Sequence, residues 1–185
     1  MNPLKIIQKY YNPKSKAYYF LVEHSKAVTK KALEIAKKVP ELNPDLKFIK
    51  EASMLHDIGI LFTNKSEIGC SGKYPYICHG YLGRKLLEKE GFPKHALVCE
   101  RHVGTGISIK DIKEQKLPLP KRDMIPISIE EQIICFADKF FSKHKETLTK
   151  EKSVEEIQNK LKKFGDRYVK TFNNWMIKFK YEKIN

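Results

Sequence analysis

A histidine and an aspartate stand side by side at the end of an apolar run, in SMLHDIGIL, where they are His56 and Asp57. An aspartate is rarely buried without a partner, because an isolated carboxylate loses its hydration in the interior. An imidazole nitrogen and a carboxylate presented together could chelate a divalent cation, and one carboxylate can also bridge two cations. Taken alone, such a pair is more often simply hydrogen-bonded, so the metal interpretation depends on further ligands.

Four further residues of the same chemistry lie elsewhere in the chain. His24 lies on or beside the apolar face of an expected helix, where a lone histidine is usually a packed core residue. Asp138 lies in a still more apolar stretch, IICFADKFF, where a charge would be costly unless it were paired or bound to metal. His79 opens an expected helix and His102 closes another. Three helical sites that each carry a buried-looking His or Asp, plus two histidines at helix ends, are hard to explain as separate accidents.

The elements that must position these residues are expected to be helices, because apolar residues recur at spacings of three and four between capping signals. We predict helices over 3–11, 15–39, 44–57, 77–90, 93–102, 108–115 and 128–145, followed by a final helix with an apolar face from Ile157 to Phe179. Residues 63–76 are expected to form a loop, and the Pro-rich segment 117–126 should be extended. The predicted fold class is therefore all-α, with Trp175 and Phe179 packed on the core.

The chain carries His24, then the pair His56–Asp57, then Asp138, each in an expected helix or at its end. This order resembles the H…HD…D signature of the HD-domain superfamily of metal-dependent phosphohydrolases. The run HDIG at 56–59 matches the commonest variant of the central motif. His79 and His102 match the positions that hold a second metal in the dinuclear branch. The resemblance covers a core of about 22–141 and implies a single HD-type helical bundle over 1–185, with a C-terminal helical extension over 147–185.

The resemblance implies two metal sites that share Asp57. The first ligand set would be His24, His56, Asp57 and Asp138, and the second Asp57, His79 and His102. Imidazoles and carboxylates without thiolates suit two divalent transition-metal ions, with iron expected first and manganese, zinc or cobalt as alternatives.

The implied activity is hydrolysis of a phosphate ester or anhydride by a metal-bound hydroxide, with Asp57 at the catalytic centre. The segment from His79 to FADK resembles enzymes that split diadenosine tetraphosphate symmetrically, so a nucleotide or dinucleotide polyphosphate is the expected substrate. Two departures stand out. The Pro-rich segment 117–126 is not part of that pattern, and Ile60 replaces the lysine that many members carry three residues after the aspartate, which excludes a lysine-assisted mechanism there.

Three cations adjoin the expected ligands and are predicted to bind phosphate and assist catalysis: Arg84, Arg101 and Lys139. Thr105, in the Thr–Gly step after His102, is a further predicted substrate-binding residue. For each cation the alternative is an ordinary surface charge.

The 185 residues carry 36 basic and 22 acidic side chains, a net charge of +14, which would suit an anionic partner. Only four of the basic residues are arginine, and the lysines are interleaved with acids, so nucleic acid is not the expected partner. A small phosphorylated molecule is expected instead, and a homodimer is left open. The apolar runs are too short to cross a bilayer and the N-terminus has no signal-peptide pattern, so we expect a cytoplasmic protein with no membrane partner.

Two other classes of function stay open. A small helical group with the same ligands uses a mixed-valent di-iron centre as an oxygenase, and the ligands alone cannot separate the two chemistries. The third class is a basic nucleic-acid-binding helical domain whose metal site is structural. The four cysteines form no C-x-x-C pair, which predicts neither a zinc ribbon nor a disulfide framework.

Overall fold

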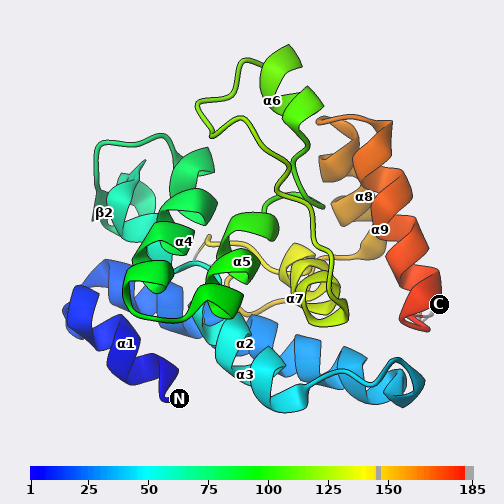
Figure 1. The fold of residues 1–185 in the computed structure, drawn as a ribbon, viewed down its shortest axis with the longest axis horizontal. Coiled ribbons are helices and arrows are strands. Elements are labelled where there is room, and N and C mark those ends of the chain that lie inside the picture. The colour runs from blue at the N-terminus through cyan, green and yellow to red at the C-terminus, as the bar shows by residue number, and fades with distance from the viewer. Residues whose placement is uncertain (145–146, 182–185) are drawn as a thin grey trace.

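The computed structural model describes residues 1–144 and 147–181 and confirms the all-α fold class (Figure 1). The α-helices are α1 Pro3–Tyr10, α2 Lys16–Lys38, α3 Leu46–Leu55, α4 His79–Lys89, α5 Pro93–Arg101, α6 Ile109–Glu114, α7 Ile129–Lys139, α8 Val154–Lys162 and α9 Asp166–Lys178. Short 3-10 helices also occur among the described residues: η1 Pro40–Leu42, η2 Ile58–Phe62, η3 Ser66–Ile68 and η4 Tyr76–Cys78. The strands β1 Asn64–Lys65 and β2 Cys70–Ser71 pair antiparallel.

Short polar side chains begin several helices where the sequence predicts starts. Asn2 and Ser15 accept hydrogen bonds from backbone N–H groups in the first turns of α1 and α2. Ser153 forms a complete capping box at the start of α8. At α7, Ser128 caps the helix, but the Glu131 carboxylate accepts from the N–H of Ile127 instead of completing the expected box.

The long helix α2 packs against both α3 and α7, and α4 packs against α5 (Figure 1). Helices α8 and α9 cover the other side of α7 and bring their aromatic face into the core. Phe136 and Phe172 are fully buried, with ring centroids 4.9 Å apart. Trp175 and Phe179 join the same cluster, which confirms that the C-terminal aromatic face packs on the core.

Three predicted boundaries differ from the structure. The helix expected through Lys145 ends at Lys139, and Lys145 itself lies outside the described residues. The single final helix is divided into α8 and α9 around Gly165, whose φ of 132° is incompatible with a continuous right-handed helix. The loop predicted over 63–76 contains the two short strands, which are too short to show an alternating pattern.

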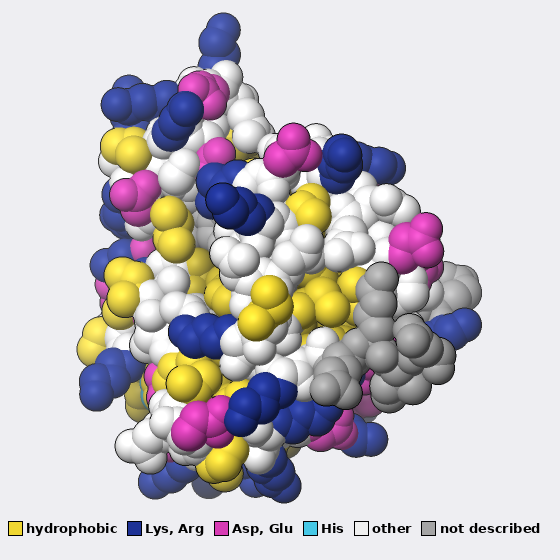
Figure 2. Space-filling view, turned by 90° about the vertical axis from the view of Figure 1, so that its right-hand side faces the viewer, with side chains coloured by type: hydrophobic (Ala, Val, Ile, Leu, Met, Phe, Trp, Pro, Cys, Tyr) yellow, Lys and Arg dark blue, Asp and Glu magenta, His cyan; other side chains and the backbone are white. Residues whose placement is uncertain are grey.

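The face that carries α8 and α9 mixes its charges. Figure 2 shows Lys and Arg side chains around its rim with acidic side chains between them, while apolar side chains gather near the centre. Within the described residues, no helix combines the length and the apolar character that a bilayer crossing requires.

We expect Gly59→Ala to destabilise the protein, because a Cβ atom at this position would overlap the carbonyl oxygen of His79 and the backbone nitrogen of Gly83. Overpacking of this kind costs about 1–3 kcal/mol, so the thermal unfolding midpoint should fall by several degrees. Lys89→Ala, at an exposed position on α4, serves as the control. A Gly59→Ala protein as stable as the wild type would show that α4 can move away from this turn freely.

Candidate metal centre

Helix α3 carries the His56–Asp57 pair into the interior. Asp45 begins the helix by accepting a hydrogen bond from the N–H of Phe48. The helix ends at Leu55, so the two functional residues follow at its C-terminus, and neither has any exposed surface. A buried carboxylate must therefore be stabilised by neighbouring cations or hydrogen-bond donors.

The turn that follows this pair is held by Tyr11. The Tyr11 hydroxyl donates a hydrogen bond to the carbonyl oxygen of Ile58 at 2.6 Å and accepts one from the N–H of Leu61 at 2.9 Å. Tyr11 is 2% exposed, so these bonds are shielded from water. Residues at the end of α1 thus fix the backbone directly after Asp57.

The first expected ligand set converges on one oxygen of Asp57. The Nε2 atom of His24 lies 3.2 Å from Asp57 Oδ2 and 3.0 Å from Asp138 Oδ1. The Nε2 atom of His56 lies 3.0 Å from the same Asp57 oxygen. One ligand atom from each of these four residues lies within 4.8 Å of every other, so the set could hold one metal ion.

The second expected set converges on the other oxygen of Asp57. The Nε2 atoms of His79 and His102 lie 3.3 Å and 3.4 Å from Asp57 Oδ1, and 3.1 Å from each other. The two carboxylate oxygens therefore face different groups of imidazoles. This is the arrangement that a carboxylate shared by two cations requires.

Three of the imidazoles are oriented by the same local device. The Nδ1 atoms of His56, His79 and His102 each lie within hydrogen-bond distance of the backbone carbonyl three residues earlier, and those carbonyls belong to Ser53, Tyr76 and Cys99, at 2.6, 2.6 and 2.7 Å. A carbonyl oxygen can only accept, so Nδ1 carries the proton in each ring. In the neutral form of each ring the lone pair is then on Nε2, which faces Asp57, as metal coordination demands.

Several buried polar atoms at this point have no hydrogen-bond partner among the described residues: His56 Nε2 and both Asp57 carboxylate oxygens. Burial raises the pKa of the Asp57 carboxyl, but Lys143 and His56 outweigh it and hold that pKa well below its usual range. Burial lowers the pKa of His56, but Asp57 and Asp138 outweigh it and raise that pKa to about 9, so without metal His56 carries a proton beside the ionised, incompletely partnered Asp57 carboxylate. This donor set fits iron, manganese, zinc or cobalt.

Two ammonium groups offset part of the negative charge. Lys143 Nζ lies 2.5 Å from Asp57 Oδ2, without hydrogen-bond geometry. Lys139 Nζ lies 2.8 Å from Asp138 Oδ2 and donates a hydrogen bond to the carbonyl oxygen of His102. Burial lowers the pKa of Lys143, but the Asp57 carboxylate raises it above its ordinary value, so this lysine is charged.

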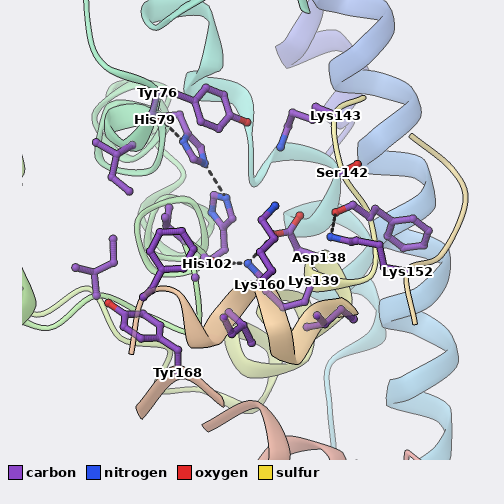
Figure 3. A pocket seen from close by; sticks show the side chains of 18 of the residues that line it. Tyr76, His79, His102, Asp138, Lys139, Ser142, Lys143, Lys152, Lys160 and Tyr168 are labelled. Carbon is purple, nitrogen blue, oxygen red and sulfur yellow. Dashed lines mark hydrogen bonds and ion pairs between the residues drawn. The ribbon is translucent and has the colours of Figure 1, made fainter. Parts of the chain in front are cut away.

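The cluster faces a cavity of about 440 Å³ (Figure 3). Five lysines line it, and they are Lys65, Lys139, Lys143, Lys152 and Lys160. Asp138 is the one carboxylate among the lining residues that the structure describes. The rest of the wall is largely apolar, with Val103, Ile107, Leu117, Phe164 and Tyr168. A small molecule with both anionic and apolar parts fits such a space.

Comparison with known proteins identifies the fold around this cluster. The HD domain family profile matches residues 21–142, about two thirds of the chain. The chain belongs to the HD domain family. Together with the His/Asp cluster, this membership indicates a metal-dependent hydrolase.

Proteins similar to this chain differ in how much of their own length it covers. The uncharacterized protein MJ0778 of Methanocaldococcus jannaschii is 33% identical over 150 residues, which cover 80% of this chain and 76% of the relative. Proteins of Thermoplasma volcanium and Picrophilus torridus, each named tRNA (cytidine(56)-2'-O)-methyltransferase, are 32% identical over 124 and 123 residues. Those alignments cover 66% of this chain, which spans only about a third of the two methyltransferase-named proteins. No solved structure matches the chain.

The HD domain brings the six residues predicted as metal ligands into one cluster, but it does not bring the two predicted arginines to the cavity. Arg84 and Arg122 both pair with the Glu100 carboxylate, which is 1% exposed and needs countercharge. Arg101 pairs with Glu131 at 2.9 Å. These arginines stabilise buried carboxylates on neighbouring elements. In this structure their guanidinium groups therefore form ion pairs within the protein and do not face the cavity.

The other two predicted substrate-binding residues differ from each other. Lys139 lines the cavity, with its ammonium group against Asp138. Thr105 is fully buried and is not among the lining residues, and its hydroxyl donates to the carbonyl oxygen of Tyr168 at 3.5 Å.

Sequence reasoning missed the lysines that reach the cavity from outside the ligand-bearing helices. Lys143 follows the end of α7, so its approach to Asp57 depends on a turn of the backbone. The spacing of apolar residues along the sequence does not predict that turn. Ile60, which replaces the expected lysine, is fully buried. An ammonium group nevertheless lies next to Asp57, because Lys143 supplies it from another segment.

We expect substitutions in the two ligand sets to reduce the metal content of the protein by different amounts. Asp57→Ala should lose both ions, whereas Asp138→Ala and His102→Ala should each lose about one of two, because each removes a ligand from one set only. Elemental analysis of the purified variants measures this, with Glu155→Ala on the surface of α8 as a carboxylate control. An Asp57→Ala protein that is folded and fully metallated would contradict the shared site.

We expect Arg84→Met to lower the free energy of unfolding by about 1–3 kcal/mol, because it leaves the buried Glu100 carboxylate with one fewer partner. Metal content should not change. Denaturant unfolding measures the effect, with Lys85→Met at an exposed position of the same helix as the control. Unchanged stability would mean that Arg84 is free to serve the phosphate-binding role predicted from the sequence.

Proposed function

We propose that this HD domain is a metal-dependent phosphohydrolase that acts on a small phosphorylated molecule. The observation that carries the proposal is a single cavity whose wall combines a cluster of metal-ligating residues with five lysines. Phosphoryl oxygens bind both divalent cations and ammonium groups, and charge-assisted hydrogen bonds to them are strong. A predominantly apolar wall without cations would favour a different substrate class.

The ligand geometry supports a division of the cluster between two ions. His24, His56 and Asp138 would hold one, His79 and His102 would hold the other, and Asp57 would be shared. Bound there, divalent ions such as iron or manganese would activate water at neutral pH and stabilise negative charge on a phosphoryl group.

The protein's own side chains would position the phosphoryl group. Lys139 and Lys143 place ammonium groups beside the two carboxylates of the cluster, where they can also contact phosphoryl oxygens. Figure 3 shows the Tyr76 hydroxyl on the same side of the cavity as Lys143. Burial raises the pKa of Tyr76 above its ordinary value, so the hydroxyl stays protonated and can donate a hydrogen bond.

The substrate that we propose is a nucleotide or a dinucleotide polyphosphate. The apolar side of the cavity includes Tyr168 and Phe164, whose rings offer a surface for a base, while the lysines suit the phosphates. The volume of about 440 Å³ suits part or all of one such molecule.

Two other activities are less well supported. A di-iron oxygenase would share the ligands, but five lysines around the cluster favour a phosphate-bearing substrate. The name of the two methyltransferase relatives suggests an RNA substrate, yet this chain corresponds to only a third of their length. On the face that Figure 2 shows, charges are mixed and do not form the continuous basic surface that nucleic acid binding favours.

A hydrolysis screen tests the proposal directly. Purified protein supplied with Fe²⁺ or Mn²⁺ should release phosphate or a nucleotide from a panel of nucleoside mono-, di- and triphosphates and dinucleoside polyphosphates. Asp57→Ala should lose at least about a thousandfold in kcat/KM, because removal of a shared ligand disables both metal positions. Glu155→Ala should keep full activity. Oxygen consumption without phosphate release, or full turnover by Asp57→Ala, would contradict the proposal.

A further inference from the structure

Three of the five lysines in the cavity have no carboxylate partner within the part of the chain that the structure describes, and these are Lys65, Lys152 and Lys160. Lys65 follows Asn64 in β1, and its ammonium group lies 4.2 Å from the centroid of the Tyr76 ring. Lys152 donates a hydrogen bond to the carbonyl oxygen of Phe141 at 2.7 Å. The ring contact of Lys65 and the hydrogen bond of Lys152 orient these two groups, but neither supplies a compensating negative charge.

Burial and neighbouring ammonium groups in the cavity disfavour the charged form of each of these three lysines. Burial, and then Lys143, lower the pKa of Lys65. Burial, and then Lys160, lower the pKa of Lys152 to about 8. Lys160 lies at the exposed mouth of the cavity, and burial followed by Lys139 lowers its pKa as well. Repulsion among cations that converge on one space costs free energy, and an anion bound among them would relieve it.

Two of these lysines, Lys152 and Lys160, reach the cavity from a different part of the fold than the metal ligands. Figure 3 shows His79 and His102 on one side of the cavity and Lys152 on the other, with Lys160 reaching in from α8. Lys152 and Lys160 lie beyond residue 142, outside the part of the chain that matches the HD domain family. Lys152, which precedes α8, and Lys160 on α8 therefore add cationic groups to the cavity from outside the family match.

The number of cations exceeds what one phosphoryl group needs. A phosphoryl group at the cluster would already face Lys139 and Lys143 and the ions held by the ligand sets. Three further ammonium groups line the same cavity, Lys65 beside Tyr76 and the other two across from His79 and His102, so a ligand with further negative charge would offset them.

We propose that Lys65, Lys152 and Lys160 form a second anion subsite, which binds a phosphate group of the substrate other than the one at the metal cluster. The substrate is then a compound with at least two linked phosphate groups, and not a monophosphate. This inference rests on the proposed function for the placement of the first phosphate, but its test does not depend on turnover.

Calorimetric titration of the metal-loaded protein with two stable probes tests the subsite. Methylphosphonate carries one phosphoryl group and methylenediphosphonate carries two, and neither is hydrolysed. The wild type should bind the diphosphonate about tenfold or more tightly, because the second group gains charge-assisted contacts. The double variant Lys152→Met/Lys160→Met should lose most of that preference and keep its methylphosphonate affinity within about twofold. Metal content is measured before and after each titration.

The control removes the same charge from elsewhere on the surface. Lys150→Met/Lys162→Met changes two exposed lysines that do not line the cavity, and it should keep the wild-type preference. Lys65→Met should also weaken the preference for the diphosphonate. Because Lys65 lies outside the C-terminal helices, this variant tests the subsite even if the double variant misfolds there. Equal affinity of the wild type for both probes, or an undiminished preference in the test variant, would overturn the subsite.

The outcomes also separate this inference from the proposed function. A preference for the diphosphonate that depends on Lys152 and Lys160 supports the subsite even if no phosphate ester is hydrolysed. Hydrolysis of phosphate esters with no such preference would support the proposed function and overturn the subsite.

Discussion

The carboxylate of Asp57 has no exposed surface and lies between two groups of imidazoles. The rest of the structure has to stabilise this buried charge. Removing such a group from water costs several kcal/mol unless cations and donors compensate it. Lys143 supplies one cation, and the two oxygens face separate histidine groups that are suited to metal ions. The site is therefore stable only if several distant segments arrive at the same point.

The fold meets this requirement by placing helix ends around Asp57. Helix α3 ends just before it, α4 begins with His79, and α5 ends just before His102. At helix ends an imidazole can donate from Nδ1 to a carbonyl three residues earlier, which leaves Nε2 directed at the carboxylate. Gly59 lets α4 approach the turn after Asp57 closely enough for this to happen.

The helical framework and the ligand cluster were predictable from the sequence, whereas the substrate side of the cavity was not. Helix starts followed from local capping by residues such as Ser15 and Ser153, and the ligands followed from the resemblance of the H…HD…D pattern to the HD-domain superfamily. The break at Gly165 and the position of Lys143 depend on tertiary packing, which spacing along the chain does not encode. Proximity in sequence misled in the case of Arg84, because the buried Glu100 holds it away from the cavity.

The proposed function depends on the carboxylate of Asp57, which two metal ions would share. A crystal structure of the protein grown with Mn²⁺ and measured for anomalous scattering tests it most directly. Two anomalous peaks are expected, one among His24, His56 and Asp138 and one beside His79 and His102, each in contact with a different oxygen of Asp57. A fully metallated protein with no peak at Asp57, or with both ions bound elsewhere, would contradict it.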